Sequence, residues 1–386
     1  MFVVLGIIIG LVILTIIVAT HEFGHGLAAK RSGVVVEEFG IGFPPRATSR
    51  VIKKSILGKN VRYSLNWLPI GGFVKLQGEH DTDGDTGDYG AATFWQKTKI
   101  LLAGVAVNWL TAVVLLTILA LFGIPQVIDN QFTVKNDTHQ NRSLPTVNYV
   151  SEGSPGAEAG LKLGDELVKV DGRSLASAGQ LSEITEQRRG QPLEITYKRG
   201  GQTFMTTAHL RDNNDNGQGY LGVSDIQRST LRATWSAPIV GFGLTWQLTS
   251  ATYQGLGQMV ASLAQGIVHK FSSSEQSQKE ASRELSTAKN SVAGPVGLLG
   301  SILPAFVQAG PSYVILLMAI IAISLAAINI LPLPALDGGR FFLTAIFRAI
   351  KKPLSAEIEE RINGYGMMFL LLLIVVITIV DVSRFF

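Results

Sequence analysis

Long runs of apolar residues dominate the chain and set its structural class. Four of them approach or exceed the length of about 20 residues that a helix needs to cross a bilayer. They cover residues 2–20, about 100–124, about 313–331, and about 367–380 with its flanking residues. The first run has neither a basic leader nor a small-residue cleavage site, so it is not a signal peptide. The pattern predicts a multi-pass α-helical membrane protein with four transmembrane helices.

A different pattern fills residues 146–222, where short apolar runs alternate with Gly, Pro and Asp turns. Such a pattern is typical of small strands. The stretch LEITYKRGGQTFMTTAHL predicts a hairpin around Gly-Gly, and LSEITEQRR (181–189) predicts a short helix. We therefore expect a compact α+β domain between the second and third spans.

Residues 233–268 carry no charge and are a possible fifth span. Gln, Ser, Thr and Gly interrupt their apolar positions, which favours an amphipathic helix on or near the outer membrane face. The polar stretch 270–290 is expected to be a flexible outer segment.

Basic residues gather after the first span and between the third and fourth. They are Lys30, Arg31, Arg46, Arg50, Lys53, Lys54, Lys59 and Arg62, then Arg340, Arg348, Lys351, Lys352 and Arg361. The positive-inside rule places both loops in the cytoplasm, both termini outside, and the long segment 125–311 outside.

The composition argues against a nucleic-acid partner and limits which residue types could bind a metal. Charged residues make up 16% of the chain, below the roughly 25% of an average soluble protein. The net charge is +4 and the bases are not interleaved with aromatic residues, so we expect no nucleic-acid partner. The chain contains no cysteine, so any metal site must use His, Asp or Glu.

The sequence THEFGHG (20–26) is the strongest chemical signal. On a helix, His21 and His25 share one face, and Glu22 is the residue that directly follows His21. This is the H-E-x-x-H arrangement of zinc hydrolases, in which the glutamate acts as general base. A pair of surface histidines at a helix end is the alternative, but ionisable groups within a membrane are costly and are functional candidates by default.

A catalytic zinc needs a third protein ligand. Asp337, in NILPLPALDGGR (329–340), follows the third span. The predicted topology places the inner ends of the first and third helices at one depth, so this carboxylate can reach the histidines. Asp337 could instead be an interfacial helix-end residue.

Two asparagines within spans have two interpretations each. Asn329 could bind the substrate backbone or a developing oxyanion, or it could form an interhelical hydrogen bond. For Asn108 the interhelical bond is favoured.

Five segments together resemble the site-2 protease family of intramembrane zinc metalloproteases, in its RseP-type branch. They are HEFGH, NILPLPALDGGR, GGFVKLQGE (71–79), GSPGAEAGLKLGDELVKVDG (153–172) and SVAGPVGL (291–298). The fourth resembles the PDZ domain of these enzymes, present here once where some RseP-type enzymes have two. The third resembles the family's membrane-associated β-hairpin.

The resemblance implies residue roles and a cellular setting. His21, His25 and Asp337 would bind Zn²⁺, Glu22 would be the catalytic base, and Asn329 would help to bind substrate. Transmembrane proteins, such as anti-sigma factors or signal-peptide remnants, would be the substrates. The chain would reside in the bacterial cytoplasmic (inner) membrane, and its oligomeric state stays open.

The segment around Gly72, Phe73 and Val74 is a candidate substrate site, because an exposed strand edge can capture an unwound peptide by β-augmentation. A purely structural hairpin is the alternative.

The expected organisation has four parts. An N-terminal membrane core with a cytoplasmic-side β-hairpin region (about 50–79) spans 1–125, and an extracytoplasmic PDZ-like domain spans 126–225. An amphipathic helix and linker span 226–311, and a C-terminal core with the LDG motif spans 312–386. The rival functions are a non-catalytic membrane-anchored PDZ scaffold with a structural metal and, less favoured for want of an inverted repeat, a transporter.

Overall fold

The computed structural model describes residues 2–128, 130–175, 178–214, 217, 219–270 and 294–383. The chain divides into two compact units, each described by itself below. The helical unit comprises Met1–Leu121, Phe132–Val134 and Trp235–Phe386, and the sheet unit comprises Phe122–Gln131 and Lys135–Thr234.

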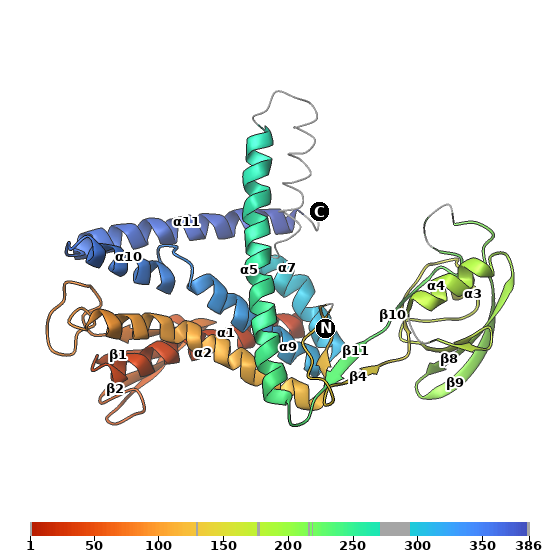
Figure 1. Ribbon diagram of the computed structural model, residues 1–386, viewed down its shortest axis with the longest axis horizontal. Helices are drawn as coiled ribbons and strands as arrows, with labels where there is room; N and C mark the ends of the chain where they lie inside the picture. Colours follow the sequence, from red (N-terminus) through yellow and green to blue (C-terminus); the bar gives the residue numbers. More distant parts are fainter. Residues whose placement is uncertain are drawn as a thin grey trace. The chain divides into compact units, whose positions relative to one another are not determined.

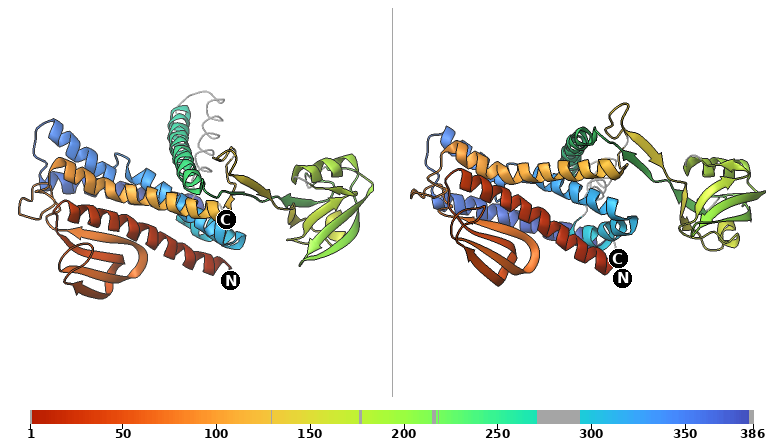
Figure 2. Two further views of the ribbon diagram at one scale, coloured as in Figure 1. Left: turned by 60° about the horizontal axis from the view of Figure 1, so that its bottom comes forward. Right: turned by 90° about the horizontal axis from the view of Figure 1, so that it is seen from below.

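Four helices of the helical unit are long and apolar enough to cross a membrane. They are α1 (Phe2–Arg31), α2 (Phe94–Phe122), α9 (Pro311–Asn329) and α11 (Ala356–Val382). In Figures 1 and 2, α1 begins and α11 ends at the same end of this helix bundle. These helices and the separate sheet-containing unit confirm the predicted fold class.

Shorter or more polar helices complete the helical unit. They are α5 (Ala237–Lys270), α7 (Pro295–Gly297), the π-helical turn η1 (Leu298–Ile302), α8 (Leu303–Ala309) and α10 (Asp337–Ala349). α5 covers the segment expected to be an amphipathic helix, and it is not among the candidate spans. Its contact with a membrane surface stays a prediction. Beyond Lys270, the segment predicted to be flexible lies outside the described residues.

Helix α1 buries one stripe along its length. The buried positions recur every three or four residues: Gly6, Gly10, Ile13, Ile17, His21 and His25. A Cβ atom on Gly6 would lie 2.9 Å from the ring of Pro304, so the glycine permits α8 to approach closely. The two histidines continue this stripe and therefore face the interior of the bundle.

A curled hairpin formed by β1 (Val36–Ile52) and β2 (Val61–Leu76) follows α1. Its first strand begins well before the expected range of about 50–79. Residues 38–41 are paired on both sides, with 62–65 and with 72–75. Segment 72–76 is therefore an edge, and no strand among the described residues pairs with its other side. This edge runs along α1, since a Cβ atom on Gly72 would lie 3.4 Å from Cα of Ala19.

The sheet unit has its own hydrophobic core. Its strands are β3 (Ile124–Pro125), β4 (His139–Arg142), β5 (Thr146–Val150), β6 (Glu166–Val170), β7 (Arg173–Ser174), β8 (Pro192–Arg199), β9 (Gln202–His209), β10 (Val223–Ile226) and β11 (Ser229–Arg232). The larger sheet has the order β10-β5-β6-β8-β9, with β7 paired to β6, and the smaller has β3-β11-β4. Two short helices, α3 (Pro155–Glu158) and α4 (Ala178–Gln187), accompany them.

Local sequence explains the hairpin of the larger sheet. Strands β8 and β9 pair in register from Pro192 with His209 to Arg199 with Gln202. The intervening Gly200 and Gly201 both adopt positive φ, which glycine permits without steric strain. The predicted Gly-Gly hairpin is confirmed.

Removing buried volume from the sheet unit should loosen that unit alone. Ile195 is fully buried, so Ile195→Ala should lower the free energy of unfolding of the sheet unit by about 3 kcal/mol. Hydrogen exchange of the full chain would then accelerate in β6, β8 and β9 but not in α1, α2 or α9. Met205 is 66% exposed, so Met205→Ala is the control with little effect. Faster exchange in the spans as well would show that the two units are not independent.

Candidate metal centre

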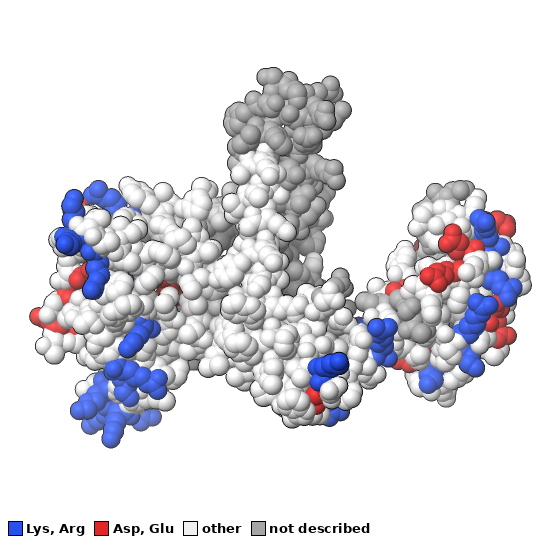
Figure 3. Space-filling view, viewed as in Figure 1, with Lys and Arg blue, Asp and Glu red and all other residues white. Residues whose placement is uncertain are grey.

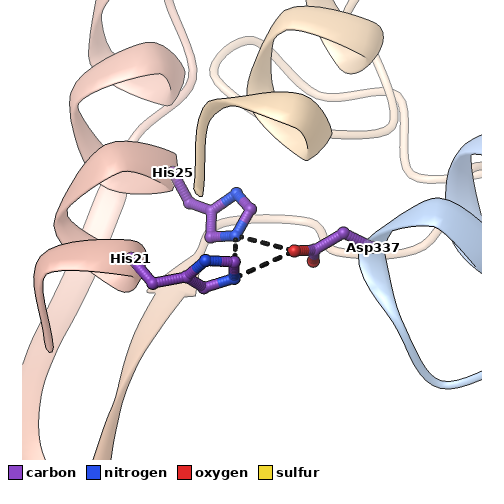
Figure 4. A group of neighbouring side chains, drawn as sticks. All are labelled: His21, His25 and Asp337. Atoms are coloured by element: carbon purple, nitrogen blue, oxygen red, sulfur yellow. Dashed lines mark hydrogen bonds and ion pairs between the residues drawn. The ribbon is translucent and has the colours of Figure 1, made fainter. Parts of the chain in front are cut away.

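Three side chains far apart in sequence converge inside the helical unit. Nε2 of His21 and Nε2 of His25 lie 3.1 Å apart, and Oδ2 of Asp337 lies 3.0 Å and 3.2 Å from them. Figure 4 shows the two imidazoles reaching from α1 toward the carboxylate at the start of α10. Among the described residues, only this group has three His, Asp or Glu ligand atoms within 4.8 Å of one another.

The carbonyl of Ile100 sets the protonation of one histidine. Nδ1 of His25 lies 2.7 Å from this buried oxygen, which can only accept a hydrogen bond. Nδ1 must therefore carry a proton, so the lone pair of a neutral His25 is on Nε2. A metal-binding histidine typically donates its other N–H to such an acceptor.

Helix α2 contributes a glycine that makes room for both imidazoles. A Cβ atom on Gly104 would lie 2.6–2.7 Å from the ring of His21 and closer still to Nε2 of His25. A real Cβ atom cannot approach so closely, so any side chain at this position would displace the ligands. Gly24 serves the same packing from α1, where a Cβ atom would lie 2.9 Å from the carbonyl oxygen of Ala103.

The amide of Asn108, one turn along α2, reaches the other histidine. It is fully buried, and its Nδ2 lies 3.2 Å from Nδ1 of His21. Its Oδ1 is buried with no hydrogen-bond partner among the described residues. If His21 binds a metal through Nε2, its Nδ1 carries a proton. Rotating the amide by 180° lets Oδ1 accept a hydrogen bond from this N–H, so the unpartnered oxygen fits a metal-binding tautomer.

A tightly folded turn delivers Asp337. Ala335 adopts φ +71°, and Asp337 is the first residue of α10. A Cβ atom on Gly338 would collide with the carbonyl of Ile330, and one on Gly339 with that of Leu333. The two glycines therefore let the chain double back after α9 and return the carboxylate toward α1.

The geometry and the donor types fit zinc. A tetrahedral zinc ion about 2.0–2.1 Å from each ligand needs ligand atoms about 3.3 Å apart, close to the spacings observed here. The set of two imidazoles and one carboxylate is one that catalytic zinc uses. Within the part of the chain that the structure describes, no fourth ligand joins the group, which leaves a position open for water.

Two further predicted residues lie beside these three. Oε2 of Glu22 accepts a hydrogen bond from the N–H of Val74 at 3.1 Å, which ties the edge strand to the carboxylate. Nδ2 of Asn329 lies 3.4 Å from Nε2 of His21. Of the remaining substrate-site candidates, Gly72 is buried against α1 and Phe73 is half-buried.

The histidines also shape the electrostatics of the carboxylate. Burial alone would raise the pKa of Asp337, but its hydrogen bonds to His21 and His25 outweigh that effect and lower the pKa well below its usual range. Asp337 is therefore ionised at neutral pH, as a metal ligand must be.

These three side chains form a possible metal-binding group, and comparison with known proteins identifies the family. The chain belongs to peptidase family M50, whose model matches residues 9–373. This is the site-2 protease family predicted from the motifs, and the chain is a zinc metalloprotease.

Bacterial relatives match along almost the whole chain. A Clostridium perfringens protein named "Putative zinc metalloprotease" is 29% identical over 97% of this chain and 98% of its own length. Zinc metalloprotease RasP of Geobacillus kaustophilus is 24% identical over 97% of both chains. Regulator of sigma-W protease RasP of Bacillus subtilis is 23% identical over 97% of this chain and 98% of its own. A solved PDZ domain from a Listeria monocytogenes protein is 21% identical over 25% of this chain and 94% of that domain, with a TM-score of 0.20.

Two residues of the second span were not predicted as part of the site. Gly104 was not singled out, and Asn108 was expected to make an interhelical bond. It does contact a neighbouring helix, but its partner there is His21. A signal was available, because a glycine and an asparagine four residues apart share one face of a helix that carries no charged residue after Lys99.

Substituting Gly104 of α2 should prevent zinc from binding at the candidate site. Gly104→Ala places a methyl group where the imidazoles lie, so we expect zinc content to fall below about a tenth of the wild-type value. Elemental analysis of the purified chain measures this. Gly255→Ala is the matched control, since a Cβ atom on this glycine of α5 meets nothing within 4 Å. Full zinc occupancy in Gly104→Ala would contradict the geometry described.

Proposed function

We propose that this metalloprotease is an intramembrane endopeptidase that cleaves transmembrane segments of other membrane proteins. His21, His25 and Asp337 hold the zinc ion, and Glu22 is the catalytic base. The observation that carries the proposal is the position of Glu22 along α1, a helix long and apolar enough to cross a membrane. Glu22 lies nine residues before Arg31, the last residue of its candidate span, or about 14 Å along the helix.

The chemistry follows from the positions of the side chains. Zinc supplies Lewis acidity for the attacking water and for the peptide carbonyl. Glu22, adjacent to His21 in the chain, takes the proton from the water and passes it to the leaving nitrogen. Asn329, close to Nε2 of His21, orients the substrate or donates to the oxyanion.

The edge strand supports a role in substrate binding. A helical substrate hides its carbonyls in hydrogen bonds, so it must unwind before cleavage. Segment 72–76 offers a strand edge that runs beside the H-E-x-x-H turn, with Gly72 against Ala19 and Val74 beside Glu22. We propose that the unwound substrate pairs with the backbone at Gly72, Phe73 and Val74 by strand addition.

Charge supports the proposed orientation in the membrane. Figure 3 shows Lys and Arg gathered over the hairpin β1–β2 and near the junction of α10 and α11. The exposed bases of the hairpin are Arg46, Arg50, Lys53, Lys54, Lys59, Arg62 and Lys75. We place this side in the cytoplasm and both termini outside. Because the relatives are bacterial, the proposed location is the cytoplasmic (inner) membrane.

The part of the sheet unit within the expected boundaries 126–225 is proposed to be an extracytoplasmic PDZ-like domain, although the unit itself runs from Phe122 to Thr234. Its small sheet with two short helices supports this. The sigma-W regulatory role in the name of the Bacillus subtilis relative supports anti-sigma factors as one substrate class. Signal-peptide remnants are the second class. The three-ligand site argues against the scaffold alternative, because a structural zinc is usually enclosed by four protein ligands.

Removing the carboxylate of the base should separate binding from catalysis. Glu22→Gln should keep zinc but slow cleavage by at least about 100-fold, because an amide cannot accept the proton. Cleavage of a tagged single-span substrate by purified enzyme, together with zinc analysis, tests this. Retained cleavage in Glu22→Gln would remove the base assignment.

Breaking the strand edge should impair cleavage while zinc stays bound. Val74→Pro removes the N–H that faces Glu22 and distorts the edge, so we expect turnover to fall about tenfold or more. Val74→Ala keeps the N–H and is the control. Equal turnover of the two variants on a transmembrane substrate would count against strand addition.

A further inference from the structure

The position of Asp337 depends on what holds the start of α10, because no side chain caps this helix. Its N-cap residue, Leu336, makes no side-chain hydrogen bond. The first strong anchor along α10 is Arg340, three residues after the carboxylate. Nη2 of Arg340 donates to Oε1 of Glu359 at 3.0 Å and to the carbonyl of Glu79 at 2.8 Å.

Glu359 joins Arg340 to the polar loop at residues 78–90. This carboxylate is only 6% exposed, and its Oε2 accepts the N–H of Asp81 at 3.2 Å. The side chain of Asp81 forms an ion pair with Lys97 at the start of α2. The ring of Tyr89 is close to both cations, 5.1 Å from Cζ of Arg340 and 5.5 Å from Nζ of Lys97. Burial raises the pKa of Tyr89, so the phenol stays neutral there.

One stripe of α11 contacts the whole turn that carries Asp337. Glu359, Asn363 and Gly366 are spaced by four and three residues, which places them on one helix face. Oδ1 of Asn363 accepts the N–H of Ala335 at 3.4 Å. A Cβ atom on Gly366 would lie 2.7 Å from the carbonyl oxygen of Pro334. The turn therefore rests on α11 from Pro334 through Arg340.

We propose that Arg340 and Glu359 are positioning residues that hold Asp337 within reach of the two histidines. The inference rests on the proposed function, since it takes Asp337 as a zinc ligand. A buried guanidinium–carboxylate pair with further backbone bonds has a defined geometry. The pair thus fixes α10 against α11 and the polar loop three residues after Asp337, whose carboxylate reaches the two imidazoles. Neither residue touches the histidines, so both act through the backbone of α10.

Zinc affinity of the full chain in detergent, measured by competition with a chelator, tests this. Arg340→Met should weaken zinc binding by at least about tenfold. Arg340→Lys keeps the charge without the planar fork, so it should fall between wild type and Arg340→Met. The matched control is Arg361→Met, which removes an exposed pair with Glu357 on the same helix and should change affinity less than twofold.

A double variant separates positioning from stability. Replacing a buried ion pair by apolar residues often restores stability, so Arg340→Met/Glu359→Met should recover the thermal midpoint lost by Arg340→Met. It should not recover zinc affinity, and the visible bands of its cobalt-substituted form should differ from those of wild type.

Each outcome decides a different point. Wild-type zinc affinity in both Arg340→Met and the double variant overturns the positioning role and leaves the proposed function standing. Recovery of zinc affinity together with stability in the double variant overturns it as well, because the effect would then be one of folding. A wild-type chain that binds no zinc overturns both proposals.

Discussion

The structure depends on the cost of keeping ionisable groups away from water inside a lipid-facing helix bundle. Histidine and aspartate side chains at that depth are tolerated only when each polar atom has a partner. Here three ligand atoms face one another, and the remaining imidazole nitrogens face Ile100 and Asn108. A zinc ion would complete this arrangement, because it would bind lone pairs that otherwise face one another.

Small residues are the means by which the helices come close enough. Gly24 and Gly104 bring α1 and α2 into contact at the level of the histidines. Nearer the start of α1, Gly6 allows α8 to pack closely against α1. The absence of a side chain at each point is therefore as specific a requirement as the presence of the ligands.

Many features of the fold and the candidate site could be predicted from the sequence, because they depend on short stretches of the chain. The H-E-x-x-H spacing is a property of one helix turn, and the four spans follow from apolar length alone. The convergence of Asp337 with the histidines was predictable because topology limits which helix ends share a depth. The roles of Gly104, Arg340 and Glu359 could not be predicted this way. They depend on which residues of separate elements touch, and single-sequence patterns do not encode such contacts.

The spacing of the proposed ligands along the chain also has a consequence for the synthesis of the protein. Of the three proposed ligands, His21 and His25 are in the first helix, and Asp337 follows His21 by 316 residues. A ribosome must synthesise this whole stretch before the last donor exists. With this proposed ligand set, a chain that stops before Asp337 has no complete metal site, so such a fragment in the membrane would not be a protease.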